Sequence, residues 1–163
     1  MALAAAVVTP KLIEHVGAMK ERDAAAAIKA AAAPAPVTYP SRSVVIEPDR
    51  QGHFRVEARV DGRRLSFMVD TGASVIALTA RDAARLGIRP SRSEHTAMVK
   101  TANGSVKAAP AQLRAVEVDS ITVRDVPALV LPDEALSENL LGLSFLSRLR
   151  RFEYARGKLV LEQ

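Results

Sequence analysis

The sequence predicts an all-β domain, closed into a barrel with one or two short helices, that follows an alanine-rich helical arm. From residue 41 onward the chain is a series of short β-branched or alternating segments, separated at regular intervals by turn residues. By contrast, the first 35 residues contain 14 alanines and no aromatic residue. Because 163 residues suffice for one domain plus an arm, we expect an arm and linker over 1–40 and a single domain over 41–163.

The arm begins with a good helix start, because Thr9 can cap a helix and Pro10 fits its first position. We expect a helix over 10–33, ended by Pro34 and followed by a stiff linker. The opening segment 1–8 is apolar but too short to span a bilayer, and no basic residue precedes it. The arm is left open as a pro-segment, a spacer from a membrane or an oligomerisation helix.

The domain should consist of short strands joined by tight turns. Asp61-Gly62 and Asn103-Gly104 are strong hairpin signals, and Gly157 closes a last turn. Helices are expected at 79–86, capped by Thr79 and stopped by Gly87, and after Gly142 through about 149. Strands are expected at 44–47, 53–60, 65–69, 75–78, 96–101, 106–109, 112–118, 121–123, 128–131, 152–154 and 158–161.

Composition narrows the chemistry to carboxylates, hydroxyls, amines and imidazoles. The chain has no cysteine, which excludes thiol nucleophiles and thiolate metal sites, and its three histidines are too widely spaced for a metal cluster. We therefore expect no metal and no cofactor. The net charge of +5 is spread thinly, and the densest basic run, Arg148 to Arg151, has no interleaved aromatic residue. A solvated basic face is favoured, and no nucleic-acid partner is expected.

A lone carboxylate, Asp70, stands between two apolar segments. Burying a charge there is costly unless it is hydrogen-bonded, paired or protonated. Carboxylates in such unfavourable surroundings are typical of functional sites. Thr71 and Ser74 add hydroxyls, and Gly72 allows a close approach of backbone or ligand. An ordinary turn whose Asp bonds its own backbone would explain the triplet 70–72 equally well. The flanking residues favour the functional interpretation.

The segment 69–74, Val-Asp-Thr-Gly-Ala-Ser, resembles the active-site motif of the aspartic proteases. More narrowly, the chain resembles the bacterial single-domain subgroup of the retropepsin-like (clan AA) proteases. Residues 101–104 fall where that family carries a glycine-tipped flap over the substrate, and 140–142 match its second, hydrophobic-hydrophobic-glycine motif. The resemblance covers about 41–163 and implies the closed acid-protease barrel.

Site residues are carried over from this resemblance. Asp70, Thr71 and Gly72 would be catalytic, with Thr71 bracing two catalytic loops against each other. The resemblance assigns substrate binding to Ala73, Ser74, Ala102, Asn103 and Gly104, and the structural second motif to Leu140, Leu141 and Gly142. Closure of the flap would exclude water from an extended peptide.

The chain contains a single Asp-Thr-Gly motif, at residues 70–72. Pepsin-type hydrolysis needs two carboxylates, one ionised to activate water and one protonated to polarise the scissile carbonyl. The second must come from another copy, which predicts a homodimer with an Asp70 from each chain at its two-fold axis. The chain is thus predicted to be an aspartic endopeptidase acting on protein or peptide substrates, with activity bell-shaped in pH and best on the acid side.

Two other functions compete with this one. The first is a catalytically silent dimer that binds an extended peptide in the same cleft, and the second is a module for anionic surfaces. Bacterial relatives of this kind often carry a membrane anchor N-terminal to a domain outside the cytoplasm. The resemblance therefore favours a periplasmic, membrane-anchored domain, with a soluble cytoplasmic protein as the alternative.

Overall fold

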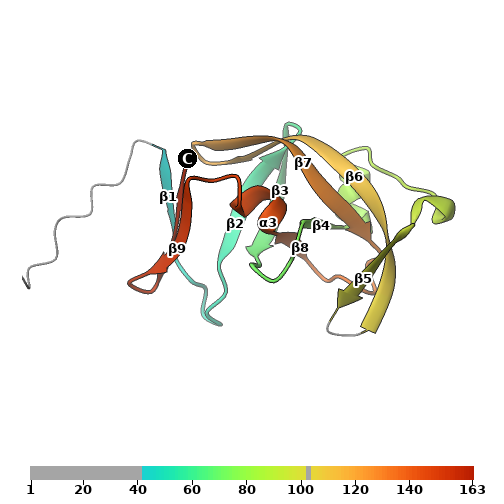
Figure 1. The fold of residues 1–163 in the computed structure, drawn as a ribbon, viewed down its shortest axis with the longest axis horizontal. Helices are drawn as coiled ribbons and strands as arrows, with labels where there is room; N and C mark the ends of the chain where they lie inside the picture. The colour runs from blue at the N-terminus through green and yellow to red at the C-terminus, as the bar shows by residue number, and fades with distance from the viewer. Residues whose placement is uncertain (1–41, 102–103) are drawn as a thin grey trace, which may run out of the picture. The chain divides into compact units, whose positions relative to one another are not determined.

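The computed structural model describes residues 42–101 and 104–163. The predicted helix over 10–33 and the residues Ala102 and Asn103 lie outside them. Figure 1 shows strands throughout, with two short helices beside them. No helix within these two ranges is long and apolar enough to cross a membrane.

Six strands close a barrel, as the sequence predicts. Their order is β2 (Arg55–Val60), β3 (Arg63–Val69), β8 (Asn139–Leu141), β4 (Ile76–Thr79), β7 (Ile121–Leu131) and β6 (Gly104–Val118). The barrel closes where Arg59 pairs with Glu117 and Val60 with Val116, between β2 and β6. Because a closed barrel leaves no free edge among these strands, each is held on both sides over part of its length.

The predicted Asp61-Gly62 hairpin joins β2 to β3 and also helps to close the barrel. Both residues have positive φ, 47° and 87°, as a two-residue turn requires. The Asp61 N–H donates to the Ala115 carbonyl at 3.0 Å, and the Ala115 N–H donates to Asp61 Oδ1 at 2.9 Å. The turn residue thereby extends the pairing of β2 with β6.

Strands β6 and β7 are longer than the sequence predicts. The expected interruptions, at 110–111 and at 124–127, are part of two continuous strands that pair from Ala109↔Val130 to Val118↔Ile121. Pro110 is tolerated because β6 has no described neighbour on its other side there, the β5 pairing ending at Ala108 and the β2 pairing starting at Val116.

The hairpin opposite the predicted catalytic loop is formed by β5 (Ala97–Thr101) and β6. Thr101 pairs with Gly104, and its Oγ1 donates to the Gly104 carbonyl at 2.9 Å. Gly104, which was predicted as the second residue of the turn, has a φ of 114° and is the first residue of β6. The two strands pair as the predicted hairpin requires.

The first predicted helix matches its sequence signals. Helix α2 (Ala80–Arg85) follows Thr79, whose Oγ1 accepts from the Asp82 N–H at 3.1 Å, and Gly87 ends it with a φ of 84°. Helix α3 (Leu143–Leu146) is shorter than predicted and continues as hydrogen-bonded turns to Leu149.

A 3₁₀ turn, η1 (Arg92–Glu94), was not predicted. Its signal is a capping box, in which the Ser91 N–H and hydroxyl both donate to the Glu94 carboxylate at 2.7 Å. These bonds, that of the Ser91 hydroxyl foremost, lower the pKa of Glu94 from its ordinary value.

The first strand and the last two strands of the described residues form a second, three-stranded sheet. Its order is β1 (Ser43–Ile46), β10 (Lys158–Glu162), β9 (Arg151–Ala155). Figure 1 shows β1 and β9 at one end of the domain and the β5 hairpin at the other. Because β10 is the central strand, its backbone is paired on both sides within one protomer. Leu159 and Leu161 belong to the main core cluster, which also contains Leu65, Phe67 and Phe145 from the barrel and α3.

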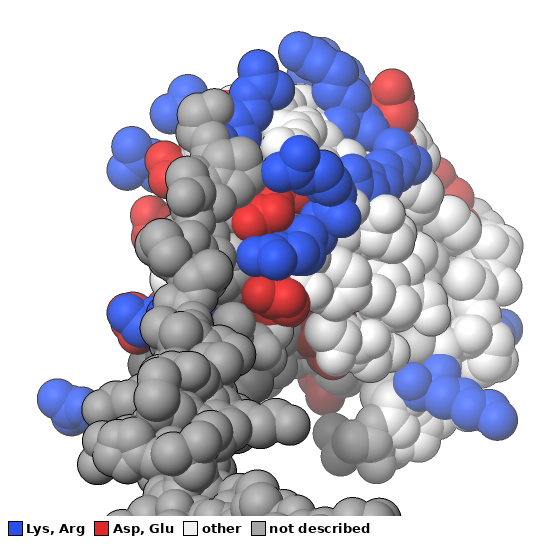
Figure 2. All heavy atoms as spheres, turned by 60° about the vertical axis from the view of Figure 1, so that its left-hand side comes forward, with Lys and Arg blue, Asp and Glu red and all other residues white. Residues whose placement is uncertain are grey.

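Charged side chains are unevenly distributed on the surface. Figure 2 shows Lys and Arg side chains gathered over one part of a face, with carboxylates between them, beside a broad area that carries neither. In the basic run 148–151, Arg148 and Arg150 are exposed, and each of the three arginines also makes a contact within the domain. Arg148 donates to the Arg124 carbonyl at 2.8 Å, and Arg151 lies 3.1 Å from Glu162, whose other oxygen is 3.7 Å from Arg150.

Candidate active site

Asp70 stands at the start of the loop between β3 and β4, half-buried at the edge of a pocket. Its Oδ1 accepts from the Gly72 N–H at 2.8 Å, and its carbonyl accepts from the Ala73 N–H at 3.2 Å. A side chain on residue 72 would bring a Cβ to 3.1 Å from that Oδ1. The tight turn thus holds the carboxylate while its other oxygen stays available.

Strand β8 fixes this loop from behind. It runs parallel to β3, pairing Met68 with Leu140 and Val69 with Leu141, and it pairs Leu140 with Ala77 of β4. The Asp70 N–H donates to the Leu141 carbonyl at 3.2 Å. The predicted second motif therefore lies between the two strands that carry the ends of the Asp70 loop.

Gly142 is required by close packing against the same loop. A Cβ at this position would lie 2.3 Å from the Val75 carbonyl oxygen and 2.6 Å from that of Ala73. The Leu143 N–H donates to the Ala73 carbonyl at 2.8 Å, so the two backbones are in direct contact. The close contact between the two backbones explains why glycine is needed at position 142. Its φ of −96° is open to any residue and does not by itself require glycine.

Sequence reasoning missed Asn139, which precedes the motif and is 2% exposed. Its Oδ1 accepts from the Thr79 N–H at 3.0 Å, and its Nδ2 donates to the Ser66 carbonyl at 2.9 Å and to Asp82 Oδ2 at 2.7 Å. One amide thus connects β8 to β3, β4 and α2. The signal that would have identified Asn139 is its place directly before the apolar pair Leu140-Leu141, because an amide buried beside apolar residues needs hydrogen-bond partners.

Ser144 is a second missed residue with a positioning role. Its hydroxyl accepts from the Ile76 N–H at 2.9 Å and donates to the Pro127 carbonyl at 2.8 Å. The hydroxyl therefore fixes the end of the Asp70 loop to β7. No local sequence pattern reveals this, because the three residues meet only in the folded barrel.

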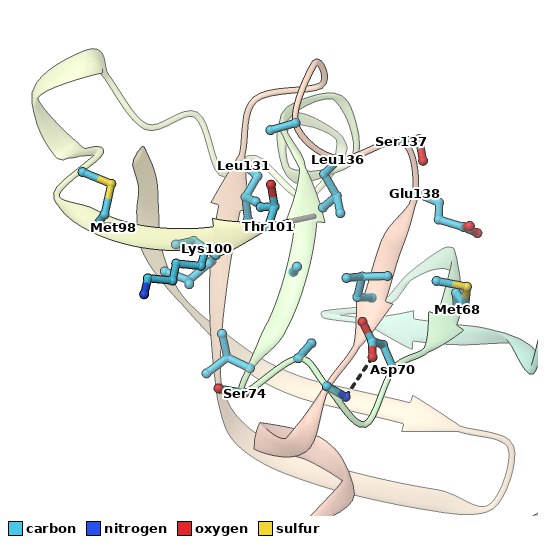
Figure 3. Close-up of a pocket in the computed structure, with 18 residues that line it drawn as sticks. Met68, Asp70, Ser74, Met98, Lys100, Thr101, Leu131, Leu136, Ser137 and Glu138 are labelled. Atoms are coloured by element: carbon cyan, nitrogen blue, oxygen red, sulfur yellow. Dashed lines mark hydrogen bonds between the residues drawn. The ribbon is translucent and has the colours of Figure 1, made fainter. Parts of the chain in front are cut away.

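The Asp70 loop, the β5 hairpin and the segment before β8 enclose a pocket of about 730 Å³. Figure 3 shows Asp70 beneath the hairpin, with Lys100 and Ser74 on one side and Met68 and Glu138 on the other. The walls contain small and apolar side chains from several strands and from the segment before β8: Ala77, Val99, Leu129, Leu131, Leu136 and Leu140. Such a cleft can take an extended peptide with apolar side chains.

The predicted site residues fall into two groups. Those that border the pocket are Asp70, Gly72, Ala73, Ser74 and Leu140. Leu141 and Gly142 lie behind the loop, Thr71 is exposed beside it, and Gly104 is at the hairpin end. Ala102 and Asn103 are outside the described residues. Met68, Lys100 and Glu138 border the pocket without having been predicted.

Three charged residues border the pocket, and one of them is already paired. Both Glu138 carboxylate oxygens are engaged by Arg55, at 3.1 and 3.0 Å. Arg55 Nε also donates to Asp49 at 3.0 Å. The His53 N–H, with smaller contributions from the Gln51 N–H and Arg55, lowers the pKa of Asp49 against an opposing desolvation effect. Asp70 and Lys100 have no ion-pair partner in the described part of the chain.

Metal ligands are not grouped in this region. Within residues 42–101 and 104–163, no three His, Asp or Glu side chains are placed to hold an ion.

Comparison with known proteins identifies the family. Residues 56–148 match the family described as "gag-polyprotein putative aspartyl protease". The crystal structure of a retropepsin-like aspartic protease from Rickettsia conorii superimposes with a TM-score of 0.65 and 39% identity, covering 73% of this chain and 89% of that one. The chain belongs to the retropepsin-like aspartic proteases.

Two curated relatives of this retropepsin-like protease are uncharacterised. An uncharacterised protein in the cobV 5′ region of Sinorhizobium sp is 41% identical over 120 residues, which cover 74% of this chain and 52% of that protein. Uncharacterised protein RP867 of Rickettsia prowazekii is 37% identical over 118 residues, 72% of this chain and 50% of that protein. The chain thus spans about half the length of these relatives. The family and barrel predicted from the sequence are confirmed.

Proposed function

We propose that this retropepsin-like protease is an aspartic endopeptidase that hydrolyses peptide bonds in extended protein segments. Its active site would form at the two-fold axis of a homodimer, from Asp70 of each copy. The observation that carries the proposal is the setting of Asp70, a half-buried carboxylate with one oxygen held by the Gly72 N–H at 2.8 Å and a pocket in front of it.

The need for a second copy follows from the carboxylates at the pocket. Of the two described acidic residues that border it, Glu138 is bound on both oxygens by Arg55. That leaves Asp70 alone, whereas the reaction needs one ionised and one protonated carboxylate. Thr71 supports the same proposal, because it is exposed and its hydroxyl has no hydrogen-bond partner within the described protomer. This hydroxyl is thus free to form a hydrogen bond with the Asp70 loop of the second copy across the dimer interface.

The proposed chemistry assigns each group one task. The ionised Asp70 takes a proton from water, whose oxygen attacks the scissile carbonyl, while the protonated Asp70 of the other copy donates its proton to the carbonyl oxygen. The Asp70 that took the proton from water then transfers it to the amide nitrogen, and the C–N bond breaks. A hydroxyl of the tetrahedral intermediate gives its proton to the other Asp70 as the product carboxyl group forms, which restores one shared proton on the pair. Gly72 supplies backbone close to the substrate, and the β5–β6 hairpin closes over the peptide and excludes water.

In the proposed dimer, the two copies would not be joined by backbone pairing of the final strand, β10. Strand β10 is already paired with β1 and β9 of its own protomer, so its backbone has no edge to offer a second copy. Contacts around the exposed loop of Thr71 and Gly72 would then contribute most. We also propose that nucleic acid is not a partner, since Arg148, Arg150 and Arg151 are engaged within the domain.

The test is cleavage of a diverse peptide mixture by the full chain, read by mass spectrometry from acid to neutral pH. We expect cleavage that is bell-shaped in pH and a loss of at least about 10³-fold in Asp70→Asn. The matched control is Asp119→Asn, because Asp119 is an exposed aspartate in the β6–β7 turn, distant in the fold from the pocket lining. This control should retain wild-type cleavage.

Two results would contradict the proposal. Equal cleavage by wild type and Asp70→Asn would assign the activity to other residues or to a contaminant. A dimer that binds peptides but leaves them uncut across the pH range would favour the alternative, a silent peptide-binding module. Sedimentation of the same samples separates an inactive dimer from a monomer that has not assembled.

A further inference from the structure

Two polar side chains on the same side of the pocket have no partner within the described residues. The Ser74 hydroxyl comes from the Asp70 loop and the Lys100 ammonium from β5, and both residues are exposed and border the pocket. Figure 3 shows both on the side away from Glu138. Each can donate hydrogen bonds, and the ammonium also carries a full positive charge.

The other side of the pocket differs in charge. There the Glu138 carboxylate is held by two nitrogens of Arg55, whose third nitrogen binds Asp49. This group of two carboxylates and one guanidinium has no unpaired positive charge to offer a ligand. A negatively charged side chain entering the pocket would therefore be attracted toward Lys100 and repelled from the side of Glu138.

We propose that Lys100 and Ser74 form a subsite for the carboxylate of an acidic residue in the substrate. The inference rests on the proposed function and adds a substrate preference to it. The subsite would select extended peptides that carry Asp or Glu a short distance from an apolar centre. The Lys100 ammonium donates to the carboxylate and the Ser74 hydroxyl donates to its second oxygen. In a symmetric dimer the subsite occurs twice, so an acidic residue on either side of the cut bond is recognised.

The size of the effect follows from the exposure of both groups. Exposed ion pairs contribute less than buried ones, and the preference for Glu over an uncharged Gln is expected to be about two- to five-fold in kcat/KM. Because the pair is screened by ions, the preference should shrink as salt is raised. The subsite thus selects among peptides that the apolar walls already accept.

The test uses two synthetic peptide pools with the same randomised apolar centre. The flanking positions carry Glu in one pool and Gln in the other. Both pools compete in one reaction, where the ratio of initial rates equals the ratio of kcat/KM. The same pools compete for binding to the Asp70→Asn protein, which measures the subsite whether or not any peptide is cut.

Wild type should prefer the Glu pool, Lys100→Met should show a ratio near one, and Lys100→Glu should prefer the Gln pool. Ser74→Ala should retain part of the preference. The matched control is Lys107→Glu, because Lys107 pairs with Met98 in the same hairpin and makes the same charge change without bordering the pocket. It should keep the wild-type ratio.

The outcomes separate this inference from the proposed function. A ratio of one in wild type, or a ratio that Lys100→Met leaves unchanged, overturns the subsite even if cleavage is efficient. An equal effect of Lys107→Glu and Lys100→Glu overturns it as well, because the general field of the protein would then explain the preference. If neither pool is cut but Asp70→Asn binds the Glu pool through Lys100, the subsite stands and the endopeptidase proposal fails.

Discussion

Strand β8 and the β5–β6 hairpin border the same pocket but are held very differently. Strand β8 lies between β3 and β4, and Leu141 and Asn139 are 0% and 2% exposed. Among the described residues, strand β5 pairs with β6 alone, and β6 joins β7 from Ala109 onward. The hairpin carries Met98, which is 64% exposed, and the exposed Lys100.

This difference indicates a division of work within the site. In the proposed mechanism the Asp70 carboxylate needs a fixed position, which buried contacts with few alternatives provide. The same proposal requires the hairpin to move to admit a peptide, and a segment with few buried contacts opens at low cost. Substitutions behind the Asp70 loop should therefore reduce stability and activity together, whereas substitutions in the hairpin should mainly change substrate use and cost less stability.

The largest effect is expected for Gly142→Ala. The added Cβ would lie 2.3 and 2.6 Å from two carbonyl oxygens, and backbone cannot move aside as a flexible side chain can. We expect a loss of at least about 3 kcal/mol in the free energy of unfolding, measured by urea denaturation, and loss of cleavage.

A glycine in open space provides the control for this prediction. Gly157 has a φ of 80° and nothing near its position for a Cβ, so Gly157→Ala should cost only about 1–2 kcal/mol. Equal losses in the two variants would show that the Asp70 loop is less rigidly held than its contacts indicate.

The next largest effect is expected for Asn139→Leu. Leucine has a similar size but leaves the Thr79 N–H and the Ser66 carbonyl without their partner. We expect a loss of about 2–4 kcal/mol in the free energy of unfolding, together with a lower kcat. Gln112→Leu is the matched exchange at an exposed strand position and should stay within about 0.5 kcal/mol. If the Asn139→Leu variant were as stable as wild type and had a normal kcat, Asn139 would not be needed to hold the Asp70 loop in place.

A smaller effect on stability is expected in the hairpin. Val99 packs against a small cluster formed by Ala77, Ala108 and Leu131. Val99→Ala should cost about 1 kcal/mol or less while raising KM several-fold, since the side chain borders the pocket. Val45→Ala, at a half-exposed position of β1, should leave KM unchanged. A fall in kcat at constant KM would indicate that the hairpin positions the reaction and does not merely select substrates.

The smallest effect concerns acid stability at the margin of the cleft. The pKa of Asp49 is lowered in the folded protein, chiefly by the His53 N–H, so its contribution is present above the ordinary value of 3.8 and is lost as pH falls through the folded value. Asp49→Asn should therefore lower Tm near neutrality, flatten the acid side of a plot of Tm against pH, and match wild type at pH values below the folded pKa. An unchanged acid limb would show that Asp49 is equally perturbed in the unfolded chain.

Sequence reasoning succeeded where local signals were strong. Thr79 and Gly87 predicted the limits of α2, and Asp61-Gly62 predicted the hairpin that closes the barrel. It failed where tertiary pairing overrides a local signal, as at Pro110, which lies within β6 because that side of the strand is unpaired. At the candidate site it predicted the Asp70 loop and the second motif. It missed Asn139 and Ser144, whose partners Thr79 and Ile76 are 60 and 68 residues away.

The amino-acid sequence by itself determined the all-β class, the tight turns, the family and the position of the single candidate catalytic carboxylate. Motif chemistry and turn chemistry are local, so they can be identified from neighbouring residues. Only the tertiary structure decided why residue 142 must be glycine, that Arg55 occupies Glu138, and that Lys100 and Ser74 share one side of the pocket. Those relations depend on distances between strands far apart in the chain, and such distances exist only once the barrel has closed.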